Sequence, residues 1–192
     1  MNALNRRTAL ERIALMLGGV ISAPALAAVE GRKLHPNGIN TFQPGQDHLL
    51  AAIADVIIPD TDTPGAKAAK AEKFIMNVVN DCYAPEEQQH FHQGLAKLEK
   101  DCQQKFGKGF EALSLQQKKE ALTTCMLEAD AERRNNRGKK APAPFFFMMK
   151  ELTTVGYFTS EIGATKALEY LPIPGKFDGC MPLSDKQKTW AL

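Results

Sequence analysis

The stretch FFFMMKELTTVGYF, Phe145–Phe158, opens with five large apolar side chains in succession. Consecutive apolar residues cover every side of a helix, so a helix of this kind must be surrounded on all sides. One interpretation is a central core helix. The other is that part of the run lies against a partner subunit, where aromatic residues and Met are favoured. The residues concerned are Phe145, Phe146, Phe147, Met148 and Met149.

Four segments upstream of this run carry apolar residues with the 3.6-residue period of a helix. Their stripes span residues 49–57, 74–82, 91–106 and 115–129. Pro59 ends the first helix, and Ser114 with Gln117 three residues later forms a capping box that starts the fourth. The stripes place Cys82 and Leu115 among the inward-facing residues.

The chain as a whole predicts an all-α fold, because no segment of useful length alternates apolar and polar residues as a half-buried strand would. We expect a compact helical domain of about five helices, with an irregular C-terminal tail from about residue 156. At 192 residues the chain suits one domain. The predicted organisation is a signal peptide over 1–27, an extended lead-in over 28–46 and a single helical domain over 47–192.

The first 27 residues have the composition of a signal peptide. Arg6 and Arg7 form a basic head before a short apolar run, and Ala25 with Ala27 supplies the small residues of a cleavage site. The apolar run is shorter than the ~20 residues that span a bilayer. An uncleaved N-terminal anchor or an ordinary amphipathic helix is the alternative.

Charge argues against a nucleic-acid partner. The chain carries a formal net charge of +2, and the first 27 residues account for it, which leaves 21 basic and 21 acidic side chains in the body. A neutral body lacks the electrostatic footprint of a nucleic-acid or anionic-lipid binder. The one basic cluster, residues 133–140, has no interleaved aromatic residues for base stacking, so we expect a solvated helix end and linker there.

The sequence carries no recognisable catalytic or metal-binding motif. No nucleotide-binding glycine motif, metalloprotease motif or nucleophile elbow is present. His90 and His92 are two residues apart and point to different sides of a helix, so they cannot share a metal. Asp60 and Asp62 lie in a turn without the further oxygen ligands of a calcium loop, and we expect them to cap the next helix.

The four cysteines, Cys82, Cys102, Cys125 and Cys180, permit disulfide bonds in an exported chain. Cys102 and Cys125 lie on apolar stripes and are expected to be buried thiols. A hairpin of their two helices offsets them by ~10 Å, beyond the ~7 Å that a disulfide allows between Cα atoms. Cys180, in the tail, is the best candidate to reach another cysteine in this chain or in a partner. The connectivity stays open.

Two blocks, residues 49–66 and 155–180, together with the export signal, resemble the gluconate 2-dehydrogenase subunit 3 family. The resemblance implies the small subunit of a membrane-associated flavin dehydrogenase that acts on sugars, sugar acids or polyols. It further implies that FAD and the substrate chemistry reside in a separate large subunit, and that a multihaem cytochrome c with haem c carries the electrons onward. Membrane association would then arise through these partners. The family supplies no catalytic residues to this chain.

The resemblance also suggests why Arg6 and Arg7 are adjacent. A flavin enzyme folds around its cofactor in the cytoplasm, and the twin-arginine route exports folded proteins. The motif is imperfect at Asn5 and Ala9, so the general secretory route stays open. Our leading hypothesis is a non-catalytic periplasmic subunit that escorts and stabilises the large flavin subunit. The alternatives are a stand-alone periplasmic binding or scaffolding domain, and a redox or metal protein that uses the cysteines.

Overall fold

The computed structural model describes residues 42–139 and 141–169, together with positions 175, 180, 182 and 188–190. The described residues belong to one unit, Gly38–Leu192. The predicted signal peptide, with Arg6, Arg7, Ala25 and Ala27, lies outside the described residues, and so does the predicted lead-in up to residue 41. In chain order the elements are α3 (Gln46–Ile57), α4 (Ala71–Asp81), α5 (Pro85–Phe106), η1 (Phe110–Ala112), α6 (Leu115–Asn135), α7 (Phe145–Phe158) and η2 (Gly163–Ala167).

The all-α prediction is confirmed. Five α-helices, one short 3₁₀ turn (η1) and one π-helical turn (η2) account for the regular structure of the described ranges. Those ranges contain no β-strand, and extended chain pairs there only in an isolated bridge between Glu169 and Trp190. None of the described helices is long and apolar enough to cross a membrane.

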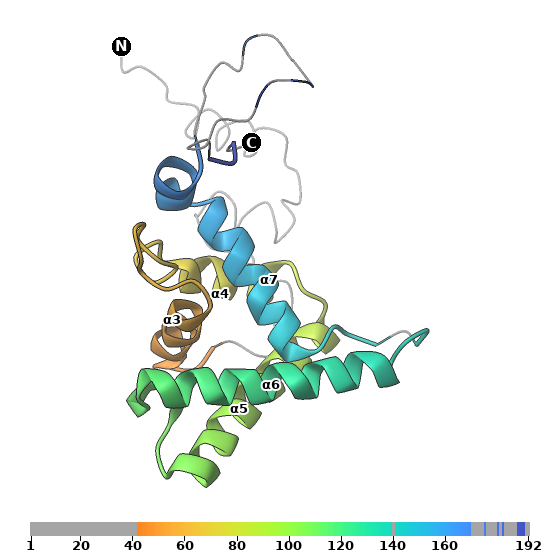
Figure 1. The fold of residues 1–192 in the computed structure, drawn as a ribbon. Coiled ribbons are helices and arrows are strands. Elements are labelled where there is room, and N and C mark those ends of the chain that lie inside the picture. Colours follow the sequence, from red (N-terminus) through yellow and green to blue (C-terminus); the bar gives the residue numbers. More distant parts are fainter. Residues whose placement is uncertain are drawn as a thin grey trace, which may run out of the picture. The chain divides into compact units, whose positions relative to one another are not determined.

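Helix α7 occupies the centre of the fold. It packs against α3, α4, α5 and α6, and Figure 1 shows it crossing between the α3–α4 pair and the long helices α5 and α6. Four of the five residues that open α7 are buried within this chain, and Phe147 is half-buried. The core-helix interpretation therefore accounts for Phe145, Phe146, Met148 and Met149. Contact between this run and a partner subunit stays a prediction.

The other helices bury the apolar stripes that their sequences predict, with two exceptions. Leu50, Ile75 and Leu95 are fully buried in α3, α4 and α5. The predictions for Leu115 and Cys82 are wrong. Leu115 is 59% exposed because it is the first residue of α6, and Leu113, just before the cap, takes the inner position instead. Cys82 is exposed because α4 ends at Asp81 and the chain turns away there.

The helix ends follow from local side chains. Ser114 and Gln117 form the predicted capping box of α6, in which the backbone N–H of Gln117 donates to the Ser114 hydroxyl over 3.3 Å. Helix α5 begins with a proline in its first turn and is followed directly by Gly107, whose φ of 71° lies in the left-handed region that favours glycine. Helix α7 continues through Gly156 to Phe158, past the point where we expected irregular chain to begin.

Candidate interaction sites

The two sequence blocks that carry the family resemblance meet in space. The hydroxyl of the buried Tyr157, near the end of α7, donates a 2.7 Å hydrogen bond to the carbonyl oxygen of Pro64 in the turn after α3. Within that turn the Asp60 carboxylate accepts a hydrogen bond from the Gly65 N–H. Asp60 therefore folds the turn on itself, and the Asp62 carboxylate accepts a hydrogen bond from the Thr61 hydroxyl. Among the described residues no side chain caps the start of α4, so the prediction that Asp60 and Asp62 cap the next helix is wrong. A Cβ atom on Gly65 would lie 2.5 Å from the Ile58 carbonyl oxygen, so only glycine fits.

The chain after α7 is held by the same kind of contact. The Ser160 hydroxyl donates to the Tyr157 carbonyl oxygen over 2.6 Å and accepts from the Gly163 N–H over 3.0 Å. Gly163 opens the π-helical turn η2 so close to the Tyr157 carbonyl that a side chain would collide with it. A Cβ atom on Gly156 would meet the Phe74 ring at 2.8 Å. These glycines have a packing role, which the sequence alone did not define.

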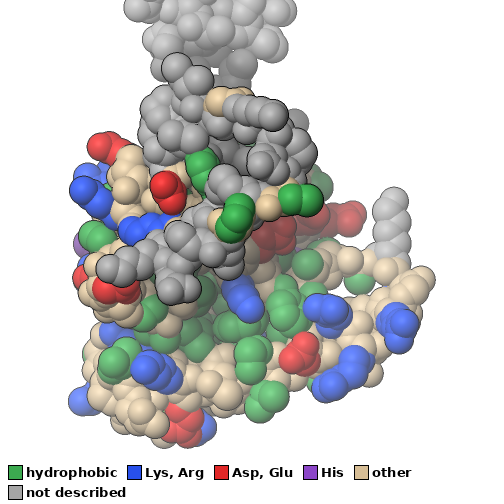
Figure 2. All heavy atoms as spheres, turned by 45° about the horizontal axis from the view of Figure 1, so that its top comes forward, with side chains coloured by type: hydrophobic (Ala, Val, Ile, Leu, Met, Phe, Trp, Pro, Cys, Tyr) green, Lys and Arg blue, Asp and Glu red, His purple; other side chains and the backbone are tan. Residues whose placement is uncertain are grey.

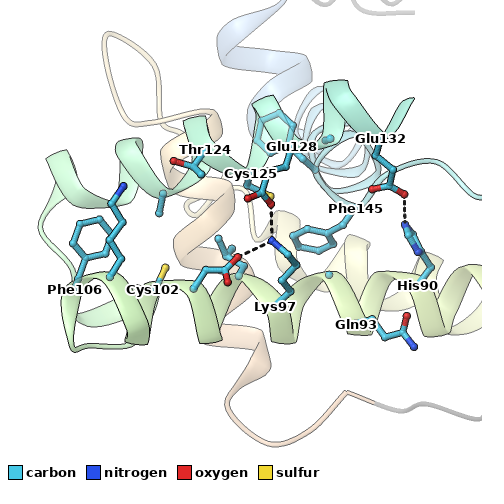
Figure 3. A pocket seen from close by; sticks show the side chains of 17 residues that line it. His90, Gln93, Lys97, Cys102, Phe106, Thr124, Cys125, Glu128, Glu132 and Phe145 are labelled. Carbon is cyan, nitrogen blue, oxygen red and sulfur yellow. Dashed lines mark hydrogen bonds and ion pairs between the residues drawn. The ribbon is translucent and has the colours of Figure 1, made fainter. Parts of the chain in front are cut away.

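A cavity of about 280 Å³ lies between α5 and α6, which we call the α5–α6 cavity (Figure 3). Its lining is mainly apolar and includes Leu98, Phe106 and Phe145 together with the thiols of Cys102 and Cys125. Phe145 brings the first residue of α7 into the lining of the cavity (Figure 3). The α5–α6 cavity is therefore assembled from three helices.

Ion pairs cover the rim of the α5–α6 cavity. The Lys97 ammonium on α5 contacts Glu128 of α6 at 2.5 Å and Asp101 of its own helix at 2.7 Å (Figure 3). Hydrogen bonds from Lys97 to Asp101 and then Glu128 raise the pKa of Lys97 well above its usual value. Lys105 and Glu120 form a second pair between the two helices at 2.7 Å. The rim cations are thus neutralised within the chain.

The two cysteines of the cavity are protonated thiols at neutral pH. Burial raises the pKa of Cys102 to about 11, and burial followed by the nearby Glu128 carboxylate raises the pKa of Cys125 to about 11. A thiol with so high a pKa is a poor nucleophile. All four cysteines lie at described positions, and none forms a disulfide bond there. Cys82 and Cys180 are exposed, and a bridge from Cys180 to a partner stays a prediction.

The histidines and acidic residues do not converge. The His90 imidazole lies 3.8 Å from Glu132 at one end of the cavity, whereas the His92 ring packs 4.6 Å from the Phe42 ring centroid. The prediction that His90 and His92 point to different sides of their helix is confirmed. Among the described residues, no group of three or more His, Cys, Asp or Glu side chains is placed to hold a metal ion.

No pattern in the sequence predicts the α5–α6 cavity. One signal for it was present: Gly94 lies inside an otherwise regular helix, where glycine lowers helix stability and often has a packing reason. A Cβ atom on Gly94 would overlap the Phe145 side chain. The glycine marks the point where α7 approaches α5, but its partner could be identified only from the fold.

These features define a small all-α domain that has interhelical packing surfaces and a largely apolar cavity. The chain belongs to the gluconate 2-dehydrogenase subunit 3 family, whose model matches residues 44–175. Family membership implies a subunit of a dehydrogenase complex. A search of curated proteins and a search of solved structures found no match.

Proposed function

We propose that this chain is the non-catalytic small subunit of a periplasmic flavin-dependent dehydrogenase complex. It escorts the large flavin subunit during export and stabilises it afterwards. The family match over residues 44–175 carries the proposal. In this complex FAD and the substrate site belong to the large subunit, a cytochrome subunit with haem c receives the electrons, and both hold the complex at the membrane.

The adjacent Arg6 and Arg7 support the escort role. FAD is inserted into a folding protein in the cytoplasm, so a flavin subunit must be exported already folded. A twin-arginine signal on this chain serves both subunits if they dock before export. The large subunit then needs no signal of its own.

Co-expression tests the escort role. The large flavin subunit is produced with this chain, without it, and with this chain as the Arg6→Lys/Arg7→Lys variant. We expect active flavin enzyme in the periplasm only with the unaltered chain. Full periplasmic activity without this chain would exclude the escort role, whereas normal export of the pair with the lysine variant would exclude only the twin-arginine route.

The α5–α6 cavity favours one second candidate, a stand-alone periplasmic binding domain. Its volume of about 280 Å³ and its mainly apolar lining suit a small apolar ligand. Native mass spectrometry of the mature chain distinguishes the two functions. A stable monomer that retains a small molecule and ignores the flavin subunit would favour the binding domain. A chain that is isolated mainly in complex with the flavin subunit would favour the escort.

A further inference from the structure

A second hollow, of about 940 Å³, lies where the end of α6, the following linker and the outer face of α7 meet. We call it the basic hollow. Figure 2 shows Lys and Arg side chains gathered over the C-terminal end of α6, toward the right of the view. The lining residues that matter here are Arg133, Arg134, Arg137, Phe147, Lys150 and the linker residues 141–144.

The cations of the basic hollow are not neutralised within the described part of the chain. Arg133, Arg134, Arg137 and Lys150 are all exposed, and no ion pair with a described carboxylate involves any of them. The one acidic residue of the lining is Glu151. Four like charges around one hollow repel one another, and an acidic partner would relieve that repulsion.

The C-terminus of α6 explains only part of this charge. Cations in the last turn of a helix are stabilised by the helix dipole, which accounts for Arg133 and Arg134. Arg137 follows the end of α6, and Lys150 belongs to α7. Two separate elements therefore bring cations to the same hollow, beyond what one helix end requires.

The basic hollow also has an apolar side and a stiff wall. Phe147 is half-buried, and the Arg133 guanidinium carbon lies 5.3 Å from the centroid of its ring. Val155, which faces the same hollow two turns along α7, is 43% exposed. Pro142 and Pro144 restrict the linker that forms the opposite wall. Cations beside an apolar strip in a pre-shaped hollow match a peptide segment that carries both carboxylates and apolar side chains.

We infer that the basic hollow is the docking surface for an acidic segment of the flavin subunit. The inference rests on the proposed function, because it names where the escorted partner binds. Arginine donates two parallel hydrogen bonds to one carboxylate, so Arg134 and Arg137 can recognise Asp or Glu side chains by geometry as well as charge. A concave surface favours an inserted segment over a planar bilayer, which would meet only its edges.

Charge reversal tests the docking surface. The full-length chain with Arg134→Glu/Arg137→Glu is compared with the unaltered chain and with Lys108→Glu/Lys119→Glu, which makes the same charge change at exposed residues outside the basic hollow. Affinity for the purified flavin subunit is measured by calorimetry at low and high salt. We expect the hollow variant to lose at least about tenfold in affinity at low salt, and the control variant to lose less. The affinity of the hollow variant should also depend less on salt than that of the unaltered chain.

The outcomes separate the docking surface from the escort role. Equal affinity of the hollow variant and the unaltered chain would overturn the docking surface and leave the proposed function intact. No affinity of the unaltered chain for the flavin subunit would overturn both. Vesicles of phosphatidylcholine mixed with phosphatidylglycerol are the third arm: binding to these vesicles that is lost in the hollow variant, without any loss of affinity for the flavin subunit, would assign the hollow to the membrane and overturn the inference. Circular dichroism of each variant confirms that the helices are retained.

Discussion

The α5–α6 cavity and the basic hollow share helix α6 but treat their charges in opposite ways. At the cavity, Lys97 and Lys105 on α5 are paired with carboxylates, including Glu128 and Glu120 of α6. At the hollow, around the C-terminal end of α6, Arg134 and its neighbouring cations have no such partner among the described residues. Charges that are satisfied within a chain contribute to its own fold. Exposed charges gathered around a hollow are available to a ligand from outside.

The run that opens α7 connects the two regions. Phe145 lines the α5–α6 cavity and is 7% exposed, whereas Phe147, two residues later, lines the basic hollow and is half-buried. Successive residues of a helix point in different directions, so one apolar run can serve a core on one side and a surface on the other. The two regions therefore differ in the same way as these two phenylalanines, one in the core and one at the surface.

The largest expected effect on stability comes from replacing each of these phenylalanines with alanine. Phe145→Ala should lower the free energy of unfolding by about 3–5 kcal/mol, because it removes a buried ring and enlarges the α5–α6 cavity. Phe147→Ala should cost about 1 kcal/mol, since it removes a partly exposed ring and its contact with Arg133. Urea unfolding of the two variants measures the difference. Equal losses would show that the two phenylalanines do not divide core from surface.

A smaller change in the free energy of unfolding is expected at Gly94, and its sign should be opposite to the one that helix propensity alone predicts. Alanine in a helix interior is better than glycine by about 1 kcal/mol. Here the added methyl group would overlap Phe145, and overpacking of this kind costs about 1–3 kcal/mol, so Gly94→Ala should be destabilising. Adding Phe145→Leu to the variant should recover part of the loss. A stabilised single variant would contradict the close approach of α5 and α7.

The pH dependence of stability should also distinguish the α5–α6 cavity from the basic hollow. Cys102 and Cys125 have an ordinary pKa of 9.0 when unfolded and about 11 when folded, so both states are protonated below pH 9. Above pH 9 the unfolded chain releases these protons first, and the stability that the thiols contribute is lost as pH rises toward 11. The unaltered chain should therefore lose more stability between pH 8 and about 10.5 than Cys102→Ala/Cys125→Ala.

Arg134→Met provides the control for that measurement, because arginine keeps its charge throughout this pH range. The difference in free energy of unfolding between this variant and the unaltered chain should be the same at pH 8 and at about pH 10.5. A cysteine variant that followed the unaltered chain at every pH would show that the thiols are not buried as described.

The smallest effect is expected at the rim of the cavity. Lys97→Met removes ion pairs to Asp101 and Glu128, but the side chains are about half exposed, so the loss should be about 0.2–1 kcal/mol. Arg134→Met at the basic hollow relieves repulsion but loses the favourable interaction with the α6 dipole, so its net effect on the free energy of unfolding should be close to zero. Thermal unfolding at low and high salt measures both, and high salt should remove the difference. A larger loss at Arg134 would imply a partner for it within the chain.

The helices and the core faces were predictable because helical period and capping are local properties of the sequence. The errors at Leu115 and Cys82 lie at helix ends, where the period no longer decides which way a side chain points. The sites formed between helices were harder to predict from the sequence. The basic cluster is visible in the sequence, but Lys150 lines the same hollow only because α7 packs beside α6. The α5–α6 cavity depends in the same way on the pairing of distant helices.

The hydrogen bond from Tyr157 to Pro64 joins residues that are 93 positions apart. Its donor lies on α7, the last long helix of the described chain to leave the ribosome and the one that packs against all the others. During synthesis the earlier helices emerge before the element that fills their shared core, so that core can be completed only after α7 has emerged. A chain that stops before α7 leaves those apolar faces uncovered. Because the central helix follows the other long helices in the sequence, completion of the core waits for α7.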